Sequence, residues 1–460
     1  MTSLPPQPLS PLDGRYRVAV SALGDYLSEA GLNRARVQVE VEWLLYLTSH
    51  RMFGSEPLSE AQASALRALV TDFGQDEIDR LATLEATTRH DVKAVEYLVR
   101  EKLRELGLDA IAELTHFACT SEDINNLSYA LTVKSAVSQI WLPKLNSVVD
   151  ALHARSLEMR DASMLAHTHG QPATPTTMGK EFAVFVYRLQ RIAGQIAAGE
   201  YLGKFSGATG TFSAHAVADP SADWPSISEE FVTSLGLTWN PLTTQIESHD
   251  WQAELYGRVA HANRVLHNLA TDVWTYISLG YFRQIPQAGA TGSSTMPHKI
   301  NPIRFENAEA NLELSCAVLD SLASTLVTSR MQRDLTDSTT QRNIGVGLGH
   351  SLLALDNIQR GLTEIALDED ALTRDLETNW EVLGEAIQTV IRAEVTAGRS
   401  SISDPYALLK ELTRGKRVDR EGLAEFIRTL DIGEGAKARL LALTPAGYVG
   451  LAPQLVDRLG

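Results

Sequence analysis

The sequence has very few cysteines and no long hydrophobic run. Cys119 and Cys316 are the only cysteines among its 460 residues, too few for a disulfide framework, so a reducing cytoplasm is the expected compartment. No apolar run approaches the roughly 18 residues of a membrane-spanning helix. The N-terminus is rich in proline and lacks the basic start and apolar core of a signal peptide. We therefore expect a cytoplasmic protein that does not enter a membrane.

Positive charge is also scarce. The formal net charge is -16 and no block of Lys and Arg could follow a phosphate backbone, which argues against nucleic acid as a partner. A few arginines converging in one cleft could still bind an anionic small molecule. With 44% hydrophobic and 21% charged residues the composition is that of a globular protein, and 460 residues are too many for one hydrophobic core.

Hydrophobic spacing predicts an all-α protein of three helical domains. Residues 1–113 read as short to medium helices punctuated by glycine and proline, at about 37–49, 59–73 and 93–106. Residues 114–366 read as a central domain of long helices, and residues 367–460 as a third domain of short helices. Between two of the long helices, 201–248 is rich in Gly, Ser, Thr and Pro and is expected to form loops with at most short elements.

The central domain is predicted to be a helical bundle. Its long segments lie at about 120–159, 178–199, 250–282, 304–332 and 343–366. Thr120 and Asp123 have the form of a capping box that opens the first of them, and Pro143 is expected to bend it. Three segments carry apolar residues at alternating steps of four and three, and this spacing keeps one edge against a neighbouring helix: from Phe182 to Ile196, from Leu255 to Tyr276 and from Leu312 to Leu326. Helices this long favour association of several chains, so a homo-oligomer is expected.

The stretch Gly289–Pro302, GATGSSTMPHKINP, interrupts these helices. Small residues make its backbone adaptable, and two hydroxyls, a histidine, a lysine and an asparagine then follow between Ser293 and Asn301. This composition indicates a lid that carries chemistry, whereas the alternative is a solvated Gly/Ser linker. It contains neither the Gly-Lys-Ser/Thr ending of a P-loop nor the spacing of a Ser-x-x-Lys nucleophile.

His167 and His169 lie in LAHTHGQPATPTT, just before a long helix. A His-x-His pair can place both imidazoles on one side of a strand to bind a metal, but no further ligand cluster is nearby. The pair could also be structural. The interpretation we favour is one general acid, because the unperturbed pKa of imidazole lies nearest to neutrality.

The run GSSTMPHKINP resembles the signature loop of the fumarase, aspartase and argininosuccinate lyase superfamily, GSSxMPxKxNP, at every fixed position. The resemblance implies that the loop closes over the substrate and that Ser293 is the base that removes a carbon-bound proton. It also implies a homotetramer whose active sites draw residues from three subunits.

Other blocks resemble the adenylosuccinate lyase branch of that superfamily. They are THGQPATPTT, TSEDINN at Thr120, RHD at Arg89, RDLTDSTTQRN at Arg333, DGRY at Asp13 and TRGKRVD at Thr413. Singly, such stretches are more often helix caps, solvated first turns or surface charge. Some relatives have Asn where Arg89 stands and Arg where His167 stands, which puts only local phosphate or carboxylate contacts in doubt.

The resemblance implies loss of fumarate from a succinylated nucleotide amine, with no metal and no organic cofactor. By position, His169 and Ser293 match the general acid and the base. The residues expected to bind substrate are Arg15, Tyr16, Arg89, His90, Asp91, Thr120, Ser121, Gln245, Ser294, Lys299, Asn301, Asn307, Arg333, Ser338 and Arg342. The alternatives are another lyase of the superfamily, a metallo-hydrolase using His167 and His169, and a non-catalytic structural descendant of the kind found among lens crystallins.

Overall fold

The computed structural model describes residues 7–286, 296, 299–413 and 418–459. Its regular structure is predominantly helical, which confirms the predicted all-α class. In that part of the chain there are twenty α-helices: α1 Arg17–Leu27, α2 Glu29–Ser49, α3 Glu60–Thr71, α4 Gln75–Thr88, α5 Asp91–Glu105, α6 Ser121–Ala136, α7 Leu142–Glu158, α8 Met178–Ala197, α9 Ser213–Ala218, α10 Trp224–Ser234, α11 Asp250–Ser278, α12 Ile303–Leu326, α13 Thr336–Gln341, α14 Ile344–Thr363, α15 Glu369–Glu377, α16 Gly384–Thr396, α17 Pro405–Thr413, α18 Arg420–Thr429, α19 Glu434–Leu441 and α20 Ala452–Val456.

Short strands form small two-stranded sheets between the helices. An antiparallel pair joins β1 Ser163–Thr168 to β2 Gln171–Thr177, and another joins β5 Phe282–Gln284 to β6 Ile365–Leu367. The third pair, β3 Leu202–Gly203 and β4 Thr238–Trp239, is parallel. Single 3-10 turns lie at Met52–Gly54, Asp109–Leu114, Trp380–Leu383 and Asp457–Leu459, and a π turn lies at Val137–Trp141.

The chain divides into two compact units. Unit 1 consists of Met1–Leu145, Ile192–Arg264 and Ala308–Asp356, and unit 2 of Asn146–Arg191, Val265–Asn307 and Asn357–Gly460. The boundaries fall inside α7, α8, α11, α12 and α14, so these helices contribute residues to both units. The division into 1–113, 114–366 and 367–460 stays a prediction.

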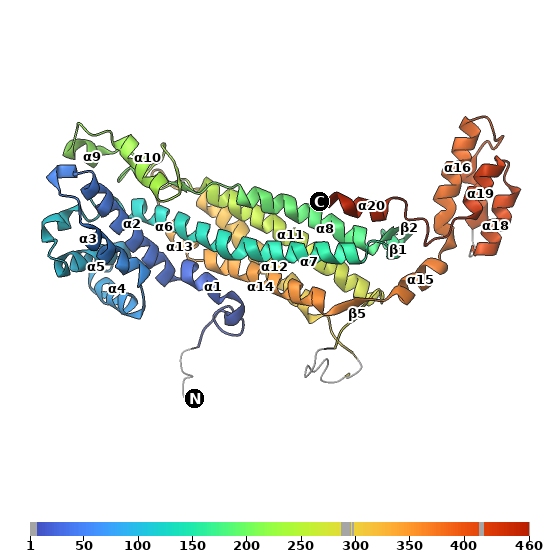
Figure 1. Ribbon diagram of the computed structural model, residues 1–460, viewed down its shortest axis with the longest axis horizontal. Helices are drawn as coiled ribbons and strands as arrows, with labels where there is room; N and C mark the ends of the chain where they lie inside the picture. The colour runs from blue at the N-terminus through green and yellow to red at the C-terminus, as the bar shows by residue number, and fades with distance from the viewer. Residues whose placement is uncertain (1–6, 287–295, 297–298, 414–417, 460) are drawn as a thin grey trace. The chain divides into compact units, whose positions relative to one another are not determined.

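In unit 1, α2 packs against α3, α5 and α6 (Figure 1). Trp43 on α2 forms the centre of an aromatic cluster, with its ring centroid 4.6 Å from that of Phe205 and 4.9 Å from that of Phe231. All three side chains are buried, and offset or tilted ring pairs of this kind add to the apolar area that they bury. The cluster attaches α10 and the segment after β3 to α2.

The predicted long helices are confirmed. The expected segments correspond to α6 with α7, and to α8, α11, α12 and α14, and the expected apolar edges are buried over most of their length. On α8, for example, the edge from Phe182 to Ile196 is buried at every predicted position. In unit 1, polar bonds reinforce this packing, because Ser351 on α14 accepts a hydrogen bond from Trp141 and donates one to Asn263 on α11.

The structure has a π turn immediately before Pro143, where the sequence predicted a bend. The N–H of Leu142 donates to the carbonyl of Val137, five residues earlier. A proline inside a regular α-helix clashes with the carbonyl four residues before it, and a wider turn relieves that clash.

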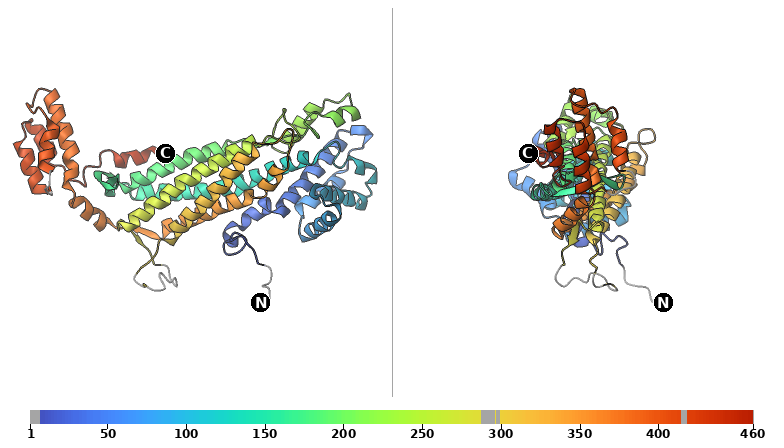
Figure 2. Two further views of the ribbon diagram at one scale, coloured as in Figure 1. Left: turned by 180° about the vertical axis from the view of Figure 1, so that it is seen from behind. Right: turned by 90° about the vertical axis from the view of Figure 1, so that its right-hand side faces the viewer.

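In unit 2 the C-terminal helices form their own core. Trp380, Leu383, Ile387 and Ile391 pack with apolar residues of α18 and α19, and Figure 2 shows these orange and red helices gathered together. None of the helices that the structure describes is long and apolar enough to cross a membrane.

Some elements differ from the sequence prediction. Helix α10 spans eleven residues inside 201–248, where only short elements were expected, and it has recognisable signals in Asp223 as N-cap and a proline in its first turn. Helices α1 and α4, and the β1–β2 hairpin, were also missed.

Candidate active site

The predicted site residues divide between the two units, and each group is described by itself. In unit 1, α6 begins at Ser121 with Thr120 as N-cap, as predicted. The backbone N–H of Thr120 donates to Asp123 Oδ2 at 2.8 Å, so a side chain of the first turn satisfies the cap. Thr120 and Ser121 are half-buried, whereas the residues that follow them on α6 are buried. Their hydroxyls therefore lie at the edge of the core.

Arg333 lies at the centre of a buried polar cluster in the same unit. Its Nη2 donates to Glu122 Oε1 at 2.8 Å, and its Nη1 donates to Gln245 Oε1 at 3.5 Å. Arg333 Nε, Asp337 Oδ2 and His249 Nδ1 are buried and have no hydrogen-bond partner among the described residues. Buried polar atoms nearly always find partners in folded proteins, so unused ones around an arginine are typical of a site that a polar ligand completes.

Glu122 is the acidic member of this cluster. Burial raises the pKa of its carboxyl above the ordinary value, and the charge of Arg333 and the hydrogen bond from Asn125 only partly offset that effect. Burial therefore disfavours the charged form of Glu122, although its carboxyl still accepts a hydrogen bond from Arg333.

Arg342 lies in a second charged cluster of unit 1. It donates to Glu29 Oε1 at 2.8 Å and to Asp91 Oδ2 at 3.4 Å, and Asp91 also pairs with buried Arg36 at 2.9 Å. Burial alone would raise the pKa of Asp91, but Arg36, the N–H of Val92 and Arg342 outweigh it and hold the pKa below its usual value. The predicted ligands Arg342 and Asp91 are therefore brought together, and they bind each other.

The remaining predicted residues of unit 1 lie at helix ends. Arg89 is the C-cap of α4 with φ 52°, and the ring of His90, the N-cap of α5, accepts the N–H of Lys93. Both side chains are exposed. The Arg15 guanidinium lies 5.9 Å from the Tyr16 ring just before α1, and the N–H of Ser338 donates to Asp337 in α13.

In unit 2, His169 lies at the tip of the β1–β2 hairpin. Thr168 pairs with Gln171, so the loop is the two residues His169 and Gly170, with φ 55° and 71°. Positive φ at both positions defines a type I′ turn, which matches the twist of the strands but strains a residue other than glycine. The strained turn places an exposed imidazole at the end of a rigid ribbon.

His167 lies on strand β1, two residues away, in a different environment. Its Nε2 is 3.8 Å from Asp375 Oδ2, and the same carboxylate accepts the hydroxyl of Tyr281. Because His169 belongs to the turn, the two imidazoles do not lie on one face of a strand. Within the residues described, no group of three or more His, Cys, Asp or Glu side chains could hold a metal ion.

The signature stretch is only partly described. Ser293 and Ser294, the predicted base and its neighbour, lie outside the described residues. Lys299 is exposed, and the Oδ1 atom of Asn301 is buried without a hydrogen-bond partner in the described part of the chain. Asn307 accepts a hydrogen bond of 2.9 Å from Asn357 near the start of α12.

Sequence reasoning missed several members of these clusters, His249 and Asn125 among them. Glu122 and Asp337 lie inside the TSED and RDLTD blocks, so an acid within a block of predicted ligands was the available signal. Arg36 and Glu29 lie on α2, whose sequence carries no such block, and nothing in their neighbourhood indicates that Arg36 pairs with Asp91 or Glu29 with Arg342.

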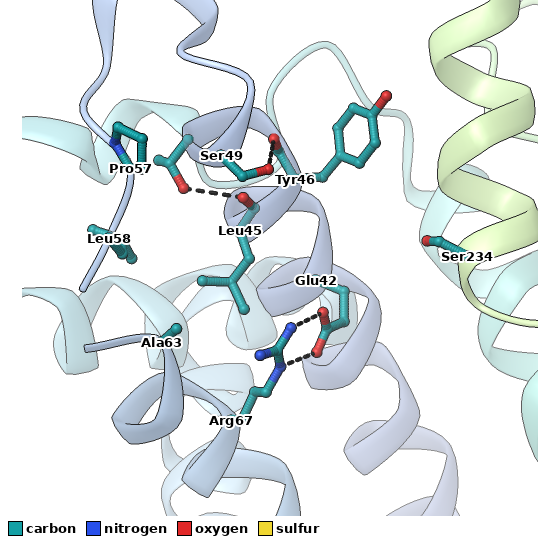
Figure 3. Close-up of a pocket in the computed structure, with 10 residues that line it drawn as sticks. Glu42, Leu45, Tyr46, Ser49, Pro57, Leu58, Ala63, Arg67 and Ser234 are labelled. Carbon is teal, nitrogen blue, oxygen red and sulfur yellow. Dashed lines mark hydrogen bonds and ion pairs between the residues drawn. The ribbon is translucent and has the colours of Figure 1, made fainter. Parts of the chain in front are cut away.

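A separate pocket of about 290 Å³ lies between α2 and α3 (Figure 3). The bidentate pair of Arg67 with Glu42 forms one wall, and Leu45 and Leu58 lie nearby. None of its lining residues is a predicted site residue, so we do not assign it to the active site.

Two protein-family models match this chain, and together they span most of its length. Residues 14–318 match a family described as lyase, and residues 329–449 match one described as adenylosuccinate lyase C-terminal. The chain is 51% identical over 453 residues to adenylosuccinate lyase of Escherichia coli K12, and 49% identical over 454 residues to that of Vibrio cholerae, with 98% of each chain covered in both cases.

Solved structures with a similar fold have much lower sequence identity. One is the 3-carboxy-cis,cis-muconate lactonizing enzyme of Pseudomonas putida, with a TM-score of 0.73, 20% identity and coverage of 95% of this chain and 96% of that one. Another is a fumarate lyase of Mesorhizobium sp. BNC1, with a TM-score of 0.73, 19% identity and coverage of 95% and 97%. At this identity the likeness concerns the fold alone.

Proposed function

The chain belongs to the adenylosuccinate lyase family, and on that premise we propose that it cleaves adenylosuccinate to AMP and fumarate. The observation that carries the proposal is the 51% identity with a curated relative over 98% of both chains. We extend the proposal to the succinylated aminoimidazole carboxamide ribotide, which carries the same succinylated amine earlier in purine biosynthesis. Both reactions are eliminations that release fumarate.

The chemistry requires one base, one acid and a site for negative charge. A proton leaves the carbon beside one carboxylate, the electron pair forms the new C=C bond, and the C–N bond on the neighbouring carbon breaks. We assign the base to Ser293 and the acid that protonates the departing nitrogen to His169. While the proton is leaving, the adjacent carboxylate gains a second negative charge, which preorganised donors must stabilise.

The described residues support separate roles in binding. The unused donor on Arg333 and the neighbouring amide of Gln245 suit an oxyanion, because a guanidinium can bind carboxylate or phosphate with two parallel hydrogen bonds. Thr120 and Ser121 would donate to a carboxylate of the succinyl group. Lys299 and Asn301 would stabilise the developing charge.

We further propose a cytoplasmic homotetramer with shared active sites. The support is the exposed position of His169 at a hairpin tip and the apolar side chains exposed on long helices, which are Val184, Tyr187, Trp274 and Leu314. Apolar groups repeated along helices of this length are typical of helix bundles that associate.

The direct test is turnover of adenylosuccinate by the purified protein. We expect the ultraviolet change of AMP formation together with release of one fumarate for each AMP. Argininosuccinate and aspartate serve as controls, and we expect at least about a hundredfold lower kcat/KM for each, since a site built for one polar group rejects substrates that leave it unpaired. An intact oligomer that turns over either control and not adenylosuccinate would overturn the proposal.

The catalytic roles are tested by Ser293→Ala and His169→Ala. Each variant should lose turnover by at least about a thousandfold while keeping the oligomeric state and substrate binding, because it removes only a proton-transfer group. Mixing the two inactive variants should recover part of the activity if the two residues of one site come from different chains. Near-normal turnover by Ser293→Ala would move the role of base to Ser294 or another group.

A further inference from the structure

Lys204 is a buried lysine that the proposed chemistry does not use. Its side chain is 0% exposed, its Nζ lies 2.9 Å from Asp123 Oδ1, and it donates to the carbonyl of Gly207 at 2.8 Å. Lysine is almost never fully buried unless it is paired, and the pair here is Asp123 at the third position of α6. The ion pair therefore lies one helical turn from Thr120 and Ser121.

Asp123 connects the start of α6 to the segment that follows β3. Its carboxylate accepts the N–H of Thr120 at 2.8 Å, that of Ser206 at 2.9 Å and that of Gly207 at 3.1 Å. Every one of these donors except Thr120 lies on the segment that contains Lys204. The carboxylate of Asp123 therefore links the start of α6 to the segment after β3.

Asn126 provides a second connection between the same two elements. Its side chain accepts the N–H of Lys204 at 2.8 Å and donates to the carbonyl of Lys204 at 2.9 Å. Gly203 allows the two elements to approach this closely, because a Cβ at this residue would lie 2.5 Å from the Leu127 side chain of α6. The first two turns of α6 are therefore fixed to 203–207 by hydrogen bonds to main chain and side chain alike.

A buried ion pair is a poor choice if only stability is needed. Apolar residues of the same volume often stabilise a fold as well or better, whereas a fully hydrogen-bonded pair can specify one geometry. At this position the geometry that is specified is that of the α6 N-terminal turn. That turn begins with Thr120 and Ser121, whose side chains are half-buried.

The charge of Lys204 matters as well as its hydrogen bonds. Without it, the buried Asp123 carboxylate would keep its backbone N–H donors but lose its lysine partner, directly behind the residues that we propose to bind a carboxylate. Like charges repel strongly where water is excluded, so an uncompensated Asp123 would oppose binding of a dicarboxylate. A ligand without carboxylates would be affected much less.

We propose that Lys204 is a positioning residue for carboxylate recognition: it neutralises Asp123 and fixes the turn that presents Thr120 and Ser121 to the succinyl group. This inference rests on the proposed function, because it takes the succinyl carboxylates to be the ligand of those hydroxyls. Lys204 acts through Asp123 and does not itself contact the substrate.

The test compares two products as inhibitors, fumarate with its two carboxylates and AMP with none. In Lys204→Met we expect the inhibition constant of fumarate and the KM for adenylosuccinate to rise by about tenfold or more, since one lost charge-assisted contact has about that effect. The inhibition constant of AMP should stay within about twofold. If Lys204 were purely structural, the substitution would lower the folded fraction, and the folded protein would keep the wild-type inhibition constants for fumarate and AMP.

The matched control is Lys134→Met, which makes the same substitution in the last turn of α6. Lys134 donates to the carbonyl of Gly236 and has no contact with Asp123 in the described structure. We expect wild-type constants for both inhibitors. Equal shifts for fumarate and AMP in Lys204→Met, or an equal fumarate shift in the control, would overturn the inference.

A second variant and a second measurement cover a failure to fold. Lys204→Gln keeps a donor for Gly207 but removes the charge, and the same selective loss of fumarate is expected. If neither variant folds, hydrogen exchange of the wild type decides, because the amides of Ser206 and Gly207 must exchange as slowly as those of α6. Faster exchange there would contradict a rigid connection. Absence of adenylosuccinate turnover in the wild type would instead count against the proposed function itself.

Discussion

At the scale of single residues, Arg333 offers a direct test of substrate binding, because its guanidinium contacts Glu122 and Gln245 and still has an Nε donor that is unused among the residues that the structure describes. Arg333→Lys keeps the charge but cannot form the paired N–H bonds of a guanidinium, so the KM for adenylosuccinate should rise by about tenfold or more. Arg330→Lys is the control, because the Arg330 side chain is 84% exposed and only approaches Asp334 at 3.8 Å. Steady-state kinetics on both variants checks the prediction, which fails if their KM values agree.

His116 gives a residue-scale prediction for pH. Its Nδ1 lies 2.6 Å from Glu40 of α2, and Glu96 of α5 and Asp123 of α6 also face it. Burial alone would lower its pKa, but the hydrogen bond that its ring donates to Glu40 and the three negative charges outweigh burial and raise the pKa above 6.5. Protonated His116 therefore stabilises the fold below pH 6.5, and that stability is lost as the pH rises through the raised value.

The variant His116→Asn tests this linkage. Asparagine tolerates the left-handed backbone at this position, where φ is 55°, and it replaces the titrating ring with a smaller side chain that stays neutral at every pH. At pH 6 we expect a loss of about 1.5 to 3 kcal/mol in the free energy of unfolding, the range for a hydrogen bond to a charged group. Urea unfolding at a series of pH values should show the difference from wild type shrinking toward pH 9. A constant difference would exclude the protonated histidine as its source.

At the scale of secondary-structure elements, two glycines of α8 should respond in opposite ways to alanine. A Cβ at Gly179 would lie 2.6 Å from the Arg160 backbone beyond α7, and neither helix end can move without breaking hydrogen bonds. Within the described ranges, a Cβ added at Gly194 would meet no atom of a neighbouring element within 4 Å. Gly179→Ala should lower the free energy of unfolding by at least about 1 to 3 kcal/mol, and Gly194→Ala should raise it by about 0.5 to 1 kcal/mol. Thermal unfolding of both variants checks the contrast, which fails if the two shifts share a sign.

The long helices could be predicted because one physical signal repeats along them. The edge from Leu255 to Tyr276 on α11 is apolar at every expected step and buried at every one except Tyr276, which is half-buried. The β1–β2 hairpin could not be predicted in the same way, because Pro172 and Pro175 argue against a strand. In a two-stranded sheet, however, both strands are edges: Pro172 is exposed, and the buried Pro175 lies where the strand register shifts, so neither interrupts the pairing.

At the scale of the whole molecule, the proposed tetramer makes assembly necessary for activity. Leu314 on α12 is 52% exposed in the single chain, and Leu314→Asp should place a charge in the subunit interface. We expect a smaller mass by light scattering and loss of turnover in the same fractions. Val217→Asp is the control, because Val217 is 85% exposed on the short helix α9. A fully active Leu314→Asp monomer would contradict shared active sites.

Of the predicted binding residues in the Arg333 cluster, only Arg333 lies in one of the sequence blocks, and the binding roles stay predictions. Arg333 and Gln245 were both expected to bind substrate, and they contact each other. The partners of Arg342 were not predictable, since Glu29 lies more than three hundred residues away and reaches it only through the packing of unit 1. Local sequence specifies the chemistry of a side chain, whereas the fold decides which other charges it meets.

The π turn at Val137–Trp141 has a consequence for how the length of this chain can vary. A turn of this kind contains one residue more than an α turn between the same two ends, so it absorbs an insertion without rotating the helix on either side. Trp141, the last residue of this turn, donates a hydrogen bond to Ser351 on α14. Deletion of one residue inside this turn, made together with Pro143→Ala, should leave a continuous α-helix in which α6 and α7 keep the faces that they pack against their neighbours. A deletion of one residue elsewhere in α6 or α7 should instead rotate one of these faces away from its neighbours.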